Sequence, residues 1–141
     1  MPHVHPRHIY YDDTDFTGVV YHANYLKYCE HAREHLVGVP ELVAMWKEGG
    51  AGFAVYEAHV RFRAPARYGD HVEVRTVIKA AGPWRTIFQQ NVHLVGHDRP
   101  LVECEIHLVC VDKDGKLVRM PEGLGPRLLA ATGQDSAPPL P

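Results

Sequence analysis

The chain has 141 residues, 45% of them hydrophobic and 23% charged, which is the composition of an ordinary globular protein with one domain. Its net charge of −2 gives no general reason to expect a nucleic acid or an anionic membrane as partner. No apolar run approaches the ~18 residues of a membrane-spanning helix, and the opening MPHVHPRH lacks the apolar core of a signal peptide. The three cysteines have no paired metal spacing, so we expect reduced thiols and a cytoplasmic location.

The first part of the chain predicts a strand followed by a long helix. Pro2 and Pro6 predict a flexible lead over residues 1–6. A strand is expected at about 7–12, after which a polar turn leads through Gly18 into the helix. Side chains of one helix face recur at three- and four-residue steps, at Tyr21, Tyr25, Tyr28, Ala32 and Leu36. Gly38 and Pro40 end this helix.

The second part predicts a sheet. A short helix at 41–48 precedes segments in which apolar and polar residues alternate, at about 53–64, 71–80, 85–95 and 101–111. A final helical turn is expected at 126–131, so that residues 7–131 form a single α+β domain. Residues 132–141 include the sequence GQDSAPPLP and predict a disordered, proline-rich tail. One helix covers only one face of such a sheet, which leaves a face and edges for a second subunit, and we expect a homodimer or homotetramer.

The acidic turn before the long helix is the strongest candidate for chemistry. A helix N-terminus presents unpaired N–H groups and partial positive charge, which suit a developing oxyanion. Asp15 lies just before it, where it could act as a base or nucleophile; alternatively, Asp13, Thr14 or Asp15 caps the helix. The neighbouring carboxylates would raise the pKa of Asp15, whereas the helix end would lower it. A calcium loop is excluded, because its twelfth position would be Asn24 instead of a bidentate Glu.

Eleven histidines raise the question of a metal. His31 and His35 stand four apart on the helix, but the residues between them are Ala-Arg-Glu, so the H-E-x-x-H arrangement is missing. The others are scattered along strands and loops. We therefore expect no metal site.

Two stretches resemble a known family. They are YYDDTD, continued by GVVYHANY and EHAR in residues 10–33, and VRFRAPARYGD at 60–70. Both are similar to the signatures of the 4-hydroxybenzoyl-CoA thioesterase family, with the YbgC/FadM-type acyl-CoA thioesterases as the nearest branch. The likeness runs from about residue 7 to residue 128. It implies the hotdog fold, an antiparallel sheet wrapped around one long central helix.

The resemblance also implies a function and a set of residues. The activity would be hydrolysis of an acyl-CoA thioester without metal or cofactor, in active sites formed between subunits. By position, Asp15 is the catalytic carboxylate, as nucleophile or general base, and His22 stands where the helix begins and its N–H points at the carbonyl. Tyr21 is expected to contact substrate, and Arg85 and Arg119 to bind the CoA phosphates. The alternative is a non-catalytic module that binds acyl-CoA or acyl-carrier protein on the same fold.

Overall fold

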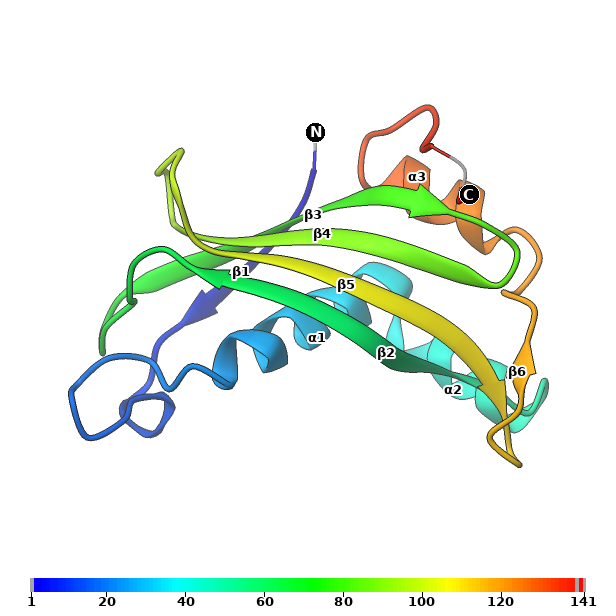
Figure 1. Cartoon of the computed structure of the whole chain (residues 1–141), viewed down its shortest axis with the longest axis horizontal. Helices are drawn as coiled ribbons and strands as arrows, with labels where there is room; N and C mark the ends of the chain where they lie inside the picture. The colour runs from blue at the N-terminus through cyan, green and yellow to red at the C-terminus, as the bar shows by residue number, and fades with distance from the viewer. Residues whose placement is uncertain (1, 139, 141) are drawn as a thin grey trace.

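A six-stranded antiparallel sheet curves around the central helix α1 in the computed structural model, which describes residues 2–138 and 140 (Figure 1). The strands are β1 (His3–His8), β2 (Ala51–Phe62), β3 (His71–Ala81), β4 (Arg85–Leu94), β5 (Pro100–Asp112) and β6 (Leu117–Val118). The helices are the 3-10 turn η1 (Tyr11–Asp13), α1 (Asn24–Val37), α2 (Val39–Lys47) and α3 (Leu124–Ala131). The strand order β1-β3-β4-β5-β2, with β6 against β5, confirms the expected hotdog fold.

The helix α1 has 14 residues and begins later than its side-chain periodicity predicts. Tyr21 lies outside it, because the backbone of the preceding segment is committed to other partners: Val20 N–H donates to Ala66 O and Tyr21 N–H donates to Asp13 O. From Tyr25 to Ala32 the predicted face is buried against the sheet, and Leu36 is partly buried. The central helix is therefore shorter than expected, and an irregular segment leads into it.

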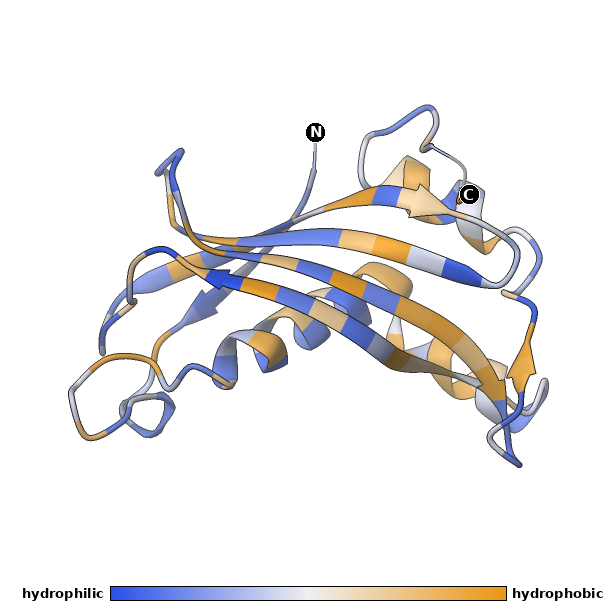
Figure 2. Ribbon diagram, viewed as in Figure 1, coloured by the Kyte–Doolittle hydropathy of each residue, from blue (hydrophilic) through white to orange (hydrophobic). Residues whose placement is uncertain are grey.

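Alternation predicted the buried faces of the central strands correctly. In β3 the buried side chains include Val72, Val74 and Ile78, and in β5 every second residue from Val102 to Cys110 is buried. The edge strand β2 differs, since its expected inner face is largely exposed in the single chain and Phe62 retains 54% of its accessible surface. Figure 2 shows hydrophobic and hydrophilic bands alternating along this strand all the same. The apolar half of β2 thus lacks a covering layer within one protomer.

Both ends of the chain are more ordered than the sequence predicts. Residues 3–6, expected in a flexible lead, belong to β1 and pair with β3, where Pro6 is tolerated because the strand is at the edge of the sheet. In the described part of the tail, the Gln134 amide bonds both backbone groups of Ile78, and Pro138 O accepts from Ala81 N–H. This segment supplies partners to the end of β3 that extends beyond its pairing with β1. These contacts differ from the disorder expected of residues 132–141; Pro139 and Pro141 lie outside the described residues.

None of the helices in the described ranges is long and apolar enough to cross a lipid bilayer.

Candidate active site

Asp15 lies in the loop that joins β1 to α1. Figure 1 shows this loop at one end of the sheet. A tight turn forms this loop: Gly18 N–H donates to Asp15 O at 3.0 Å, and Asp15 N–H donates to Val19 O at 2.8 Å. The turn requires φ +84° at Gly18, a conformation that glycine adopts without a steric penalty. The local sequence therefore fixes the Asp15 backbone and leaves its carboxylate exposed.

The loop brings Asp15 and His22 into one open cleft of about 280 Å³. Its wall combines the segment entering α1 with the end of β2 and the chain that follows it: Val19, Val20, Tyr25, Phe62, Arg63, Ala64 and Pro65. The two residues expected to be catalytic thus face the same space. Tyr21 is half exposed and its ring lies tilted against the His22 ring, with 4.5 Å between centroids, but it does not line this cleft.

Thr17 donates two hydrogen bonds to the Asp15 carboxylate. The Thr17 hydroxyl donates to Asp15 Oδ1 at 2.7 Å and the Thr17 N–H donates to the same oxygen at 2.8 Å. These bonds, the hydroxyl first, lower the pKa of Asp15 below its ordinary value, and the nearby His22 adds to the effect. The sequence left open whether the pKa of Asp15 would be raised or lowered. It is lowered, and its main cause is Thr17, which was not among the influences expected from the sequence.

Thr17→Val should move the acid limb of the pH–rate profile. Valine removes the hydroxyl donor, so the pKa of Asp15 should rise toward its ordinary value, and kcat/KM should begin to fall at a higher pH than in the wild type. Activity at pH 7 should persist, since an ordinary Asp is ionised there. Thr14→Val is the matched control, because the Thr14 hydroxyl bonds Tyr11 O. An acid limb that shifts equally in both variants would contradict the role of Thr17.

Backbone N–H groups that can donate hydrogen bonds beside the cleft lie just before α1. No side chain caps α1 at Ala23, and Asn24 N–H already donates to Tyr21 O at 2.8 Å. Among the described residues, the N–H groups of His22 and Ala23 have no backbone acceptor. The His22 and Ala23 amides, which precede the first turn at the positive end of the helix, are therefore able to meet a substrate oxygen.

Asp13 anchors the whole loop. Its buried carboxylate accepts from Arg7 Nη2 at 3.1 Å and from Tyr10 N–H at 2.7 Å. Its backbone oxygen accepts from Tyr21 N–H and from Asn24 Nδ2, both at 2.9 Å. One residue thus joins β1, the turn and the start of α1. The sequence offered Asp13 as a possible cap but gave no sign of its partner Arg7, which lies on a strand expected to begin at that residue.

The two arginines expected to bind CoA phosphates are distant from Asp15 within one chain. Arg85 pairs with Val109 on β5, whereas Phe62 of the cleft pairs with Val102, so the two places are ~24 Å apart along the strand. Arg85 Nη1 donates to the Tyr56 hydroxyl at 2.7 Å. Arg119 lies over the Trp84 ring, 5.5 Å from its centroid. A single protomer therefore does not bring the predicted phosphate ligands to the predicted carboxylate.

A second cavity, of about 340 Å³, lies between α1, α2 and the sheet. Apolar side chains make up most of its lining, at Val37, Leu42, Met45, Trp46, Phe53, Val55, Phe88 and Leu108, with Glu30, Arg33 and Glu34 from α1. Trp46 is half exposed and lines this cavity. Because its lining begins at Glu30, the cavity lies further along α1 than the Asp15 cleft, toward the C-terminal end of the helix.

These observations define a hotdog domain with an ionised, exposed aspartate at the entry to its central helix. The chain belongs to the Thioesterase-like superfamily, whose model matches residues 10–128.

Individual relatives agree with this assignment. The chain is 36% identical over 109 residues to the acyl-CoA thioester hydrolase YbgC of Escherichia coli, covering 76% of this chain and 80% of that protein. It is 38% identical over 87 residues to the acyl-CoA thioesterase YbgC of Helicobacter pylori, covering 62% of this chain and 64% of the relative. A 1,4-dihydroxy-2-naphthoyl-CoA thioesterase from Synechocystis shares the fold, with a TM-score of 0.81 and 24% identity over 91% of this chain and 96% of that one.

Proposed function

We propose that this protein hydrolyses acyl-CoA thioesters to a carboxylic acid and CoA, with Asp15 as the reacting carboxylate. The observation that carries the proposal is the ionised Asp15 carboxylate in an open cleft beside His22 and the start of α1. Similarity to the YbgC proteins, which are acyl-CoA thioester hydrolases, supports the same substrate class.

Two routes use this carboxylate. As nucleophile, Asp15 attacks the thioester carbonyl, the CoA thiolate leaves, and water hydrolyses the resulting mixed anhydride. As general base, Asp15 removes a proton from water that attacks the carbonyl directly. Both routes require an ionised carboxylate, and the lowered pKa of Asp15 is consistent with either of them. In both routes the N–H groups of His22 and Ala23 are suited to stabilise the oxyanion.

The acyl chain and CoA require surfaces beyond the Asp15 cleft. The apolar cavity containing Trp46 is suited to an acyl group, but it lies away from Asp15 in the same chain. Arg85 and Arg119 also lie far from Asp15 in the same chain. We propose that a second subunit provides these groups, so that each active site combines Asp15 of one protomer with the binding residues of the other.

A homodimer or homotetramer is therefore expected in solution. β2 is a terminal strand of the sheet, and its exposed apolar side chains include Val55, Tyr56 and Phe62. Pairing of such an edge with a second copy would satisfy its open backbone groups and bury these side chains. Multi-angle light scattering at micromolar concentration should give at least twice the chain mass of 15.9 kDa. A stable monomer that retains full thioesterase activity would contradict the shared site.

A substrate panel tests the proposed activity. Short-chain, long-chain and aromatic acyl-CoAs should be incubated with the protein, and release of the free CoA thiol should be measured. At least one class should be hydrolysed with saturation kinetics. Binding of acyl-CoA without turnover of any panel member would instead identify a non-catalytic binding module.

The cytoplasmic location stays a prediction based on the cysteines.

A further inference from the structure

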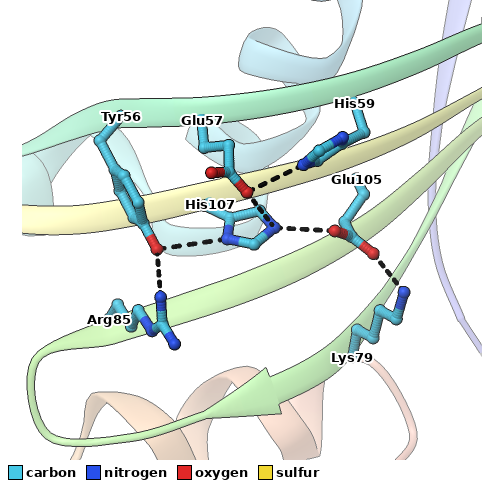
Figure 3. Close-up of polar contacts among 7 residues, drawn as sticks. All are labelled: Tyr56, Glu57, His59, Lys79, Arg85, Glu105 and His107. Atoms are coloured by element: carbon cyan, nitrogen blue, oxygen red, sulfur yellow. Dashed lines mark hydrogen bonds and ion pairs between the residues drawn. The ribbon is translucent and has the colours of Figure 1, made fainter. Parts of the chain in front are cut away.

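A compact polar cluster lies on the face of the sheet that points away from α1 (Figure 3). Glu57 and His59 come from β2, and Glu105 and His107 come from β5. The register pairs Glu57 with His107 and His59 with Glu105. Because the intervening β5 residues Cys104, Ile106 and Leu108 are buried in the core, Glu105 and His107 project to the opposite side.

Three of these side chains converge on one point. The ligand atoms of Glu57, His59 and His107 all lie within 4.8 Å of one another. Glu57 Oε2 is 2.8 Å from His59 Nε2 and 3.6 Å from His107 Nε2. Bonds of 2.0–2.2 Å place the ligands of a tetrahedral zinc ion roughly 3.3 Å apart. Only small adjustments would be needed, and the side chains of His59 and Glu57 are 62% and 48% exposed and free to make them.

The second ring nitrogen of His107 is also positioned. The His107 side chain is only 8% exposed, and its Nδ1 lies 3.3 Å from the Tyr56 hydroxyl, which in turn accepts from Arg85 Nη1. A bulge in β2 between Val55 and Glu57 inserts Tyr56 into the strand. If Nε2 binds a metal, Nδ1–H can donate to the Tyr56 oxygen. Metal-bound histidines usually have such a partner, which fixes the ring orientation.

We propose that Glu57, His59 and His107 form a binding site for a divalent transition metal, and that Zn²⁺ is the ion it fits best. Two imidazoles and one carboxylate are a ligand set suited to zinc, and a fourth position stays open to water. This departs from the expectation that the chain has no metal site. The site is separate from the thioester chemistry, because the proposed hydrolysis uses Asp15 and needs no metal.

The surrounding charges set the conditions for binding. Glu105 Oε2 lies 2.8 Å from His107 Nε2, and Lys79 pairs with the other oxygen of this carboxylate. Zinc must displace the proton that His107 shares with Glu105, while Lys79 keeps Glu105 paired. Arg85 lies on the far side of Tyr56 from His107. Bound zinc would link the edge strand β2 to β5, so it should also raise the thermal stability of the folded chain.

Isothermal titration with Zn²⁺ alone, on full-length protein freed of metal by a chelator, tests the site. The wild type should bind one Zn²⁺ per chain, and the melting temperature should rise with zinc. His59→Gln and Glu57→Gln should each weaken zinc binding at least about 10-fold, since removing even an outer-shell partner costs this much. Both residues are exposed, so the variants should fold. Tyr56→Phe should weaken binding less than His59→Gln does, because it removes only the partner of His107 Nδ1.

His35→Gln is the matched control. His35 contacts His3 and His5 in the other histidine-rich group, between β1 and α1, and this variant should bind zinc as the wild type does. Absence of binding by the wild type would show that the cluster is only an ion-pair network. Unchanged binding by His59→Gln, or loss confined to His35→Gln, would equally overturn the proposal.

Discussion

Asp15→Asn should lower kcat for the best substrate of the acyl-CoA panel by roughly 10³-fold, within the range contributed by a positioned general base. Asparagine has the same shape and can still accept the hydrogen bonds of Thr17, so the loop should keep its structure. The negative charge is lost, however, and with it both the nucleophile and the base. KM should change little, because this carboxylate acts on the reacting carbonyl. Steady-state assays of thiol release would measure both constants.

Asp12→Asn is the control for this prediction. Asp12 is an exposed acidic residue in the same turn, but it does not line the cleft. Its replacement removes the same charge and should leave kcat near the wild-type value. Equal activity of Asp15→Asn and the wild type, measured with correctly folded protein, would remove Asp15 from the mechanism.

Asp13→Ala should lower the free energy of unfolding by about 2–3 kcal/mol. The substitution leaves Arg7 without its carboxylate and Tyr10 N–H without an acceptor, and both groups lie in the part-buried junction between β1 and α1. This loss in the free energy of unfolding is smaller than for a fully buried ion pair, because the Arg7 side chain is 28% exposed. Urea denaturation followed by circular dichroism would measure the change.

A double-mutant cycle with Arg7→Met separates the ion pair from the other bonds of Asp13. The two effects should not add, and the double variant should be more stable than the sum of the single losses predicts by at least about 0.5 kcal/mol. Since the loop also holds Asp15, Asp13→Ala should reduce kcat as well. A loss of stability within about 0.5 kcal/mol would place Asp13 among ordinary surface positions.

Local chemistry in the sequence determined the order of elements and the identity of the central buried faces. Alternation in 71–80 and 101–111 predicted the inward side chains of β3 and β5, because successive residues of a strand point to opposite faces whatever their partners. The proximity of Asp15 and His22 also followed from the sequence, since only a turn and a short irregular segment separate them along the chain. The family signature then gave the fold, and the structure confirmed it.

Only the tertiary structure decided which distant segments meet. Strand register brings Glu57 and His59 to His107, and it places Arg85 far from Asp15, although no spacing in the sequence reports either distance. The chain termini were predicted as loose from their prolines, yet β1 and the segment around Gln134 pair with β3. The physical reason is that side-chain periodicity is a property of neighbouring residues along the chain. Pairing between distant segments depends instead on which backbone N–H and C=O groups at the edges of the folded sheet still lack hydrogen-bond partners.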